Sequence, residues 1–150
     1  MTTNYIQTQR LISSIFILVL CTIHGFGQKK FIITEEAPKT IDQSFFGAEI
    51  PQSGDTIFIS SNREKGIKFK NLSGNEEKPI VVINYQGQVN INDPIFWGAL
   101  TFENCMYIKV TGTGSATSKY GFKLAAQTCG LAFTELSTDC EAEFIEIDHH

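Results

Sequence analysis

Short apolar–polar–apolar motifs recur at a nearly constant spacing in the second half of the chain. Residues 100–102 (Leu-Thr-Phe) return as residues 122–124 and again as residues 145–147, so the two steps are almost equal. A second series lies between them, because residues 108–110 return as residues 131–133 after the same step. Each motif has the period of two that is typical of a strand with one buried face. Two series with a shared step predict a coil of strands in which each turn stacks on the previous one.

The predicted fold class is therefore all-β, a right-handed parallel β-helix. The alternative is a β-sandwich, whose strands would be joined by tight hairpin turns such as Asn-Gly or Asp-Gly, and the sequence contains neither dipeptide. The sequence also predicts strands before residue 98, at Phe31–Ile33, Thr56–Ile59, Ile67–Leu72, Ile80–Ile83 and Val89–Ile91. The continuous β-branched run Ile80–Ile83 is typical of a strand that is covered on both sides. The irregular spacing before residue 98 indicates longer loops at the corners of the first turns.

Residues 1–27 are predicted to be a secretory signal peptide. Arg10 is the only charged side chain before Lys29, and it precedes the apolar run Leu11–Leu20. Small residues at Gly25 and Gly27 place the cleavage site before Gln28. The alternative is a membrane anchor, but the apolar run of about ten residues is shorter than the ~20 needed to cross a bilayer. We therefore expect a secreted protein without a transmembrane segment after cleavage.

The rest of the chain divides into a cap and a coil. Residues 28–54 are predicted to form an N-terminal cap and lead-in segment, since the first turn of a solenoid has an uncovered end. Within it, Gln43–Ile50 is predicted to form a short helix or an apolar loop. Residues 55–150 are predicted to form the β-helix turns. The sequence ends directly after a strand motif, so we expect the chain to be the N-terminal part of a longer protein.

The charge balance argues against nucleic acid as a partner. Removal of residues 1–27 leaves 11 Lys and Arg against 16 Asp and Glu, a net charge of −5. An acidic chain without basic runs is a poor binder of nucleic acid. The loop Thr111–Ser115 lacks the Lys and the third Gly of the nucleotide-binding fingerprints, so it is predicted to be a corner loop. We expect no nucleotide and no cofactor, and no residue pattern supports a metal site, calcium included.

Three cysteines remain after cleavage, which are Cys105, Cys129 and Cys140. An odd number allows at most one disulfide, and no CxxC motif or zinc-type spacing is present. Cys105 and Cys129 lie about one predicted turn apart, which predicts stacked and buried thiols. The alternative is a disulfide between Cys129 and Cys140 or between Cys105 and Cys129, in an oxidising compartment.

Two asparagines follow strand motifs and are predicted to be corner residues. Asn71 and Asn104 each end a strand pattern. Asn tolerates a left-handed backbone, and its amide can hydrogen-bond along the stack of turns. The alternative is a role for these asparagines as glycan acceptors or calcium ligands.

Charged residues at outward positions are the candidate ligand-binding residues. The alternation places Lys68, Lys70 and Lys123 outward together with Glu103, and stacking in register would bring all four to one face. Lysines there would pair with the carboxylates of uronic acids, and Glu103 would tune a neighbouring lysine. The alternative is a solvated face that keeps the strands soluble.

A second cluster of charged residues suits a different chemistry. Hydrolysis with paired carboxylates needs two or three acids on one strand face. The acids Glu141, Glu143, Glu146 and Asp148 are clustered in sequence, but Glu143 has the opposite parity to Glu146 and Asp148. We assign no catalytic residue in this chain.

Three stretches contain turn and strand motifs in a fixed order. Ser53–Ile59 is similar to a "GDTI-x-I" motif, Asn71–Val82 to "G-(T/N)-x-E-(K/N)-P-I-x-(I/V)", and Gly87–Ile91 to "GG-x-V-x-I". Together they resemble the opening turns of secreted bacterial parallel β-helix proteins of the pectate-lyase-like superfamily, several of which are polysaccharide lyases. The resemblance covers residues 50–148, and its motifs are structural. It implies the fold, export, and binding or processing of an extracellular polysaccharide.

In the lyases that the chain resembles, a basic residue abstracts a proton next to a uronate carboxylate, which a second basic residue or calcium neutralises. Both groups lie in later turns than this chain contains, so whether it is an enzyme stays open. The alternative is a non-catalytic cell-surface, adhesion or structural module.

Overall fold

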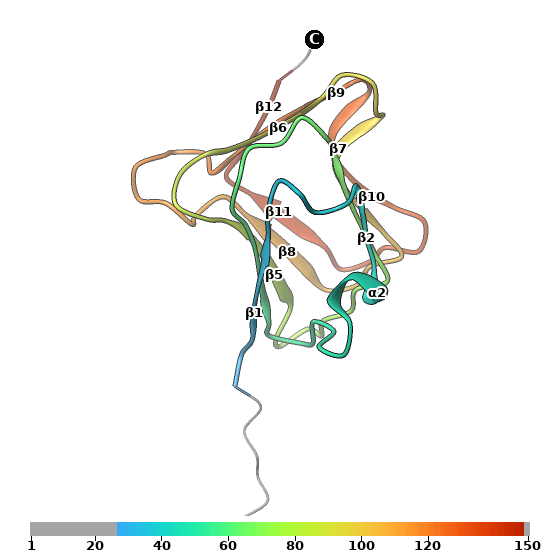
Figure 1. Ribbon diagram of the computed structural model, residues 1–150. Helices are drawn as coiled ribbons and strands as arrows, with labels where there is room; N and C mark the ends of the chain where they lie inside the picture. The colour runs from blue at the N-terminus through green and yellow to red at the C-terminus, as the bar shows by residue number, and fades with distance from the viewer. Residues whose placement is uncertain (1–26, 149–150) are drawn as a thin grey trace, which may run out of the picture.

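The computed structural model describes residues 27–148, so the predicted signal peptide lies outside the described residues except for Gly27. These residues form an all-β structure of parallel sheets that coil into a β-solenoid of about four turns (Figure 1). The predicted parallel β-helix is confirmed. Among residues 27–148, no helix has the length and apolarity needed to cross a membrane.

The strands belong to three sheets, which we call A, B and C, and each turn of the coil passes from one sheet to the next. Sheet A contains, in spatial order, β1 (Lys30–Ile33), β3 (Thr56–Ile59), β5 (Ile80–Asn84), β8 (Ile108–Thr111) and β11 (Glu141–Glu143). Sheet B contains β2 (Thr40–Ile41), β4 (Ile67–Lys70), β7 (Gly98–Glu103) and β10 (Cys129–Thr134). Sheet C contains β6 (Val89–Asp93), β9 (Phe122–Ala126) and β12 (Ile145–Ile147).

The register of the turns differs from the predicted uniform step. In sheet B, Leu100 pairs with Ile67 on one side and with Leu131 on the other, and both partners lie further away in the sequence than the predicted step allows. Only the pairing of Phe122 with Ile145 in sheet C agrees with that step. The two predicted series therefore mixed strands of different sheets. The cause is that every strand of the coil repeats the same alternation, so the motif alone does not reveal which sheet a strand joins.

The core is built by the inward residues of each strand. Ile67 and Phe69 are fully buried, whereas Lys68 and Lys70 lie outward, as the alternation predicts. The aromatic rings of consecutive turns stack in sheet B, with ring centroids 5.3 Å apart for Phe69–Phe102 and 5.2 Å apart for Phe102–Phe133. The run Ile80–Ile83 is buried on one side only, so its predicted double coverage is wrong: Val81 and Ile83 are half-exposed on the outer face.

The segment before residue 55 supplies the first turn of the coil. The predicted strand at Phe31–Ile33 is confirmed as β1, which pairs in parallel with β3. Of the two alternatives for Gln43–Ile50, the first half is the short helix α2 (Gln43–Phe46) and residues 47–50 form a loop. The N-cap Asp42 accepts a hydrogen bond from the Ser44 backbone N–H at 2.9 Å. The Phe46 ring meets the Phe31 ring edge-on at 5.2 Å, which fixes the helix against the coil.

Candidate functional site

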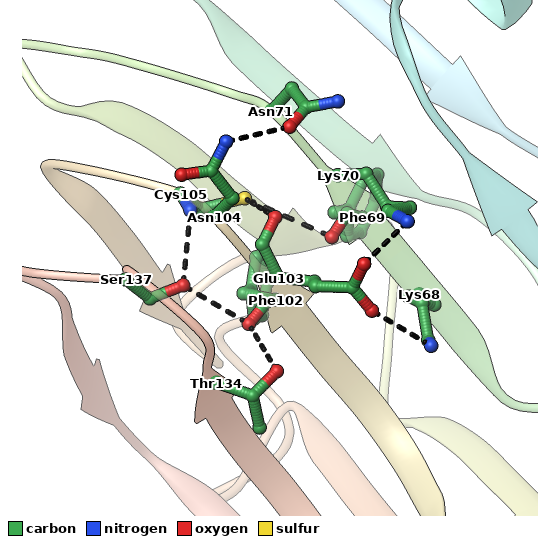
Figure 2. Close-up of polar contacts among 10 residues, drawn as sticks. All are labelled: Lys68, Phe69, Lys70, Asn71, Phe102, Glu103, Asn104, Cys105, Thr134 and Ser137. Atoms are coloured by element: carbon green, nitrogen blue, oxygen red, sulfur yellow. Dashed lines mark hydrogen bonds and ion pairs between the residues drawn. The ribbon is translucent and has the colours of Figure 1, made fainter.

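Three of the four predicted ligand-binding residues meet on the outer face of sheet B. Lys68 and Lys70 project from β4, and Glu103 projects from β7 in the next turn, directly opposite Lys70 (Figure 2). The Lys68 ammonium lies 2.9 Å from one Glu103 carboxylate oxygen, and the Lys70 ammonium contacts the other oxygen. All three side chains are partly exposed.

The contacts within this cluster shift the pKa values of Glu103 and Lys70 in opposite directions. The Lys70 and Lys68 ammonium groups lower the pKa of Glu103, because they hydrogen-bond to its charged form. Glu103 in turn raises the pKa of Lys70, with a smaller contribution from Asp42. Two ammonium groups thus share one carboxylate, which leaves one positive charge in excess within this group of three.

The fourth predicted residue, Lys123, lies on a different sheet. It projects from β9 in sheet C, where its ammonium lies 3.4 Å from Glu146 and 3.3 Å from Asp148. The prediction that all four residues share one face is therefore wrong. Its cause is the register error, because the motif spacing aligns β7 with β9, whereas β9 stacks on β6.

The acidic cluster near the end of the chain is divided between two sheets. Glu143 belongs to β11 in sheet A, while Glu146 and Asp148 face Lys123 on sheet C. Phe144 forms the corner between them with a φ of 55°. On sheet A, Lys109 of the preceding turn lies 2.9 Å from Glu141 and 3.3 Å from Glu143. Glu143 and Glu146 thus differ in parity because a corner separates their strands, so they do not share a strand face.

The corner role predicted for the two asparagines is confirmed. Asn71 and Asn104 have φ angles of 59° and 53°, and the Asn104 side-chain amide donates to the Asn71 side-chain oxygen at 2.8 Å (Figure 2). The ladder ends one turn later, where Glu135 occupies the equivalent corner with a φ of 57°.

The cysteines pack differently from the prediction. Cys129 lies beside Gly98 in the register of sheet B, so the predicted stacking of Cys105 on Cys129 is wrong. The cysteine near Cys105 is Cys140, whose sulfur lies 3.6 Å from the Cys105 backbone oxygen. All three are free thiols in the structure, so neither proposed disulfide is present in it. Burial raises the pKa of each thiol.

An apolar row on the outer face of sheet A was not predicted from the sequence. Ile32, Phe58 and Ile83 stand in register on three successive turns. Tyr85 follows, and its ring meets the Phe58 ring edge-on at 5.5 Å. The exposed fractions are 57% for Ile32 and 41% for Tyr85. The signal was present in the alternation of Thr56–Ile59, which places Phe58 outward.

No protein family, curated protein or solved structure matches this chain in comparisons with all three. The assignment of the fold as a parallel β-solenoid therefore rests on the structure and not on a relative.

Proposed function

We propose that this β-solenoid is exported and binds an extracellular polysaccharide along its outer faces. The observation that carries the proposal is the apolar row on sheet A. Ile32, Phe58, Ile83 and Tyr85 form a row of outward side chains that runs across successive turns. Ile32 and Tyr85 are exposed, whereas Phe58 and Ile83 are half-buried, and apolar groups gathered on a surface are a common feature of binding sites. Aromatic rings suit the C–H faces of sugars, and the tyrosine hydroxyl adds a polar group that can bond a sugar hydroxyl.

The cluster on sheet B supports the binding of acidic sugars to a lesser degree. Lys68 and Lys70 present ammonium groups that can pair with uronate carboxylates. Glu103 already contacts both ammonium groups, so a bound uronate would have to displace it or approach from the exposed side. The proposal therefore places neutral sugar rings on sheet A as the main ligand.

The resemblance of the opening motifs to those of secreted polysaccharide lyases agrees with export and with a polysaccharide ligand. We propose no catalytic residue, because the lyases carry their reacting groups in later turns than those described here.

A second candidate function is a non-catalytic structural or adhesion module. It is favoured by the ion pairs of the outward lysines on β8 and β9. Lys109 and Lys123 each lie between two carboxylates of the following turn, an arrangement that joins turns rather than presenting charge to a ligand.

The proposal is tested by binding of the protein from Gln28 onward to a panel of neutral and acidic polysaccharides. We expect Phe58→Ala and Tyr85→Ala to weaken retention on a neutral polysaccharide. Phe45→Ala is the matched control, since Phe45 is also an exposed aromatic residue (40%) but lies on α2. Lys68→Gln with Lys70→Gln tests the acidic panel separately. If the protein is retained by no polysaccharide, the proposal is contradicted and the structural module is favoured.

Export is tested by the mass of the mature product. Expression of residues 1–150 in a bacterium should give a protein in the exported fraction that begins at Gln28. A product that retains residues 1–27 inside the cell would contradict this part of the proposal.

A further inference from the structure

Four consecutive apolar residues, Pro94–Trp97, form the corner between β6 and β7. Pro94 and Ile95 are exposed, and the rings of Phe96 and Trp97 are only half-buried. Ile95 is 85% exposed, the largest value for a large apolar side chain among residues 27–148. A run of this length on the surface of a folded protein is unusual unless it serves a binding function.

The neighbouring turns show that the coil itself does not require this run. The strands β6 and β7 stack on β9 and β10, whose connection consists of Gln127 and Thr128 alone. The corner of the preceding turn is also shorter, and its Glu64 and Lys65 are exposed. The apolar residues are therefore confined to one turn, where the extra length of the corner loops out between two polar corners.

A buried carboxylate holds the loop in one conformation. Asp93 is 4% exposed, and one of its oxygens accepts hydrogen bonds from the backbone N–H groups of Ile95 at 3.3 Å and Phe96 at 3.0 Å. Its other oxygen accepts the Gly66 backbone N–H at 2.8 Å and lies 2.8 Å from the Lys39 ammonium. A loop that is arranged in advance loses little conformational entropy when it binds.

The shape and composition of the loop fit a phospholipid bilayer better than a protein partner. A convex apolar tip needs a cavity of matching shape on a protein, whereas a bilayer deforms around it. The rings of Phe96 and Trp97 lie 6.1 Å apart and are less exposed than the tip, and aromatic rings favour the membrane–water interface. The Lys39 ammonium lies 4.1 Å from the centre of the Phe96 ring, so a polar group borders the apolar surface.

We propose that Pro94–Trp97 is an interfacial anchor that inserts into the surface of a phospholipid bilayer. Pro94 and Ile95 enter the acyl region, and the rings of Phe96 and Trp97 lie at the level of the headgroups. The attachment is peripheral and reversible, because a single loop buries little apolar surface. It is driven by apolar burial, so it needs no anionic lipid. It is also independent of the apolar row on sheet A, since the loop joins sheets C and B.

Trp97 is the only tryptophan of the chain, so its fluorescence reports on the loop directly. The protein from Gln28 onward is titrated with phosphatidylcholine vesicles, and the bound fraction is measured in parallel by co-sedimentation. We expect the Trp97 emission to shift to shorter wavelength and the binding to persist at high salt.

Two variants test the assignment to this loop. Ile95→Asp should weaken vesicle binding at least about tenfold, because it removes the inserted aliphatic side chain and brings a charge into the acyl region. Leu136→Asp is the matched control and should bind as the wild type does, since Leu136 is 75% exposed in the corner that follows β10. Circular dichroism of both variants separates loss of binding from loss of the fold.

A wild-type protein that does not bind the vesicles would overturn the proposal. So would equal losses in the two variants, or binding that disappears at high salt. An emission shift that occurs without vesicles as the protein concentration rises would also overturn it, because the loop would then bind a second copy of the chain.

Discussion

Asn104 donates a hydrogen bond of 2.8 Å from its side-chain amide to the side-chain oxygen of Asn71, one turn away along the coil. Both residues have a left-handed backbone, with φ angles of 53° and 59°. The same two residues therefore turn the chain at the corner and join consecutive turns. Substitutions of Asn104 can therefore separate the contribution of the hydrogen bond from that of the left-handed backbone.

The Asn104→Ala variant should be less stable than the wild type by about 1–2 kcal/mol, because it loses the hydrogen bond to Asn71. In addition, alanine is strained in the left-handed conformation, since it has no polar side chain that can hydrogen-bond locally. Asn104→Gly should cost less, since glycine adopts positive φ without strain. Urea unfolding of both variants measures the difference. Equal losses for the two would show that backbone conformation at this corner contributes nothing.

Truncation of a stacked phenylalanine should depend on its turn. Phe102 is fully buried between Phe69 and Phe133, so Phe102→Ala should cost about 3–5 kcal/mol. Phe133→Ala should cost less than about 2 kcal/mol, because the Phe133 ring is only half-buried. The comparison is made by urea unfolding of the two variants. If Phe133→Ala costs as much as Phe102→Ala, the last turn is covered in solution.

The ion pairs of Glu103 should make stability depend on pH in the acidic range. The pKa of Glu103 is lower in the folded protein than in the unfolded chain, because Lys70 and Lys68 hydrogen-bond to the carboxylate. The stabilisation is thus complete above the unfolded pKa of about 4.3 and is lost as the pH falls through the folded pKa.

Unfolding of the wild type and of Glu103→Gln, measured between neutral pH and the acid range, tests this. The variant should be less stable at neutral pH, and the difference should shrink as the pH falls. Glu76→Gln, at an exposed glutamate of a corner loop, is the control. A difference that is independent of pH would contradict the assigned role of the carboxylate.

The three thiols should react at different rates with a thiol reagent. Cys105 is fully buried, whereas Cys129 and Cys140 are half-buried, so the latter two should be modified first and Cys105 only on unfolding. Higher pH should accelerate the reactions of Cys129 and Cys140, because burial raises the pKa of both thiols and the reactive thiolate forms only as the pH rises toward that pKa. Peptide mapping after timed labelling assigns each site. Fast labelling of Cys105, or a disulfide in the folded protein, would contradict the packing described.

Much of the fold was accessible from the sequence because alternation is a local property. The strand at Ile67–Lys70, with its lysines outward, follows directly from the order of apolar and polar residues. The register is not local. Leu100 pairs with Ile67, whereas the uniform step would pair it with Phe122. The choice between the two depends on the number of residues in each corner, and the alternation of apolar and polar residues does not reveal that number.

The candidate site was predictable to the same extent. The meeting of Lys68 and Lys70 with Glu103 needed only the outward parity of two strands that proved to be neighbours. The separation of Lys123 from them needed the correct register. Its two acidic partners belong to the next strand motif of sheet C and the residue that follows it, but their pairing becomes visible only after β12 is aligned with β9.

The register is the central claim, and cross-linking of paired cysteines tests it most directly. In a background without the three native cysteines, Lys109→Cys is combined with either Glu141→Cys or Ala132→Cys, and each variant is oxidised under native conditions. The structure places Lys109 opposite Glu141 on sheet A, and Ala132 on sheet B. We predict rapid cross-linking of the 109–141 pair and none of the 109–132 pair. Cross-linking of 109 with 132 instead would contradict the three-sheet register and restore the uniform step that stacks residues 131–133 on residues 108–110.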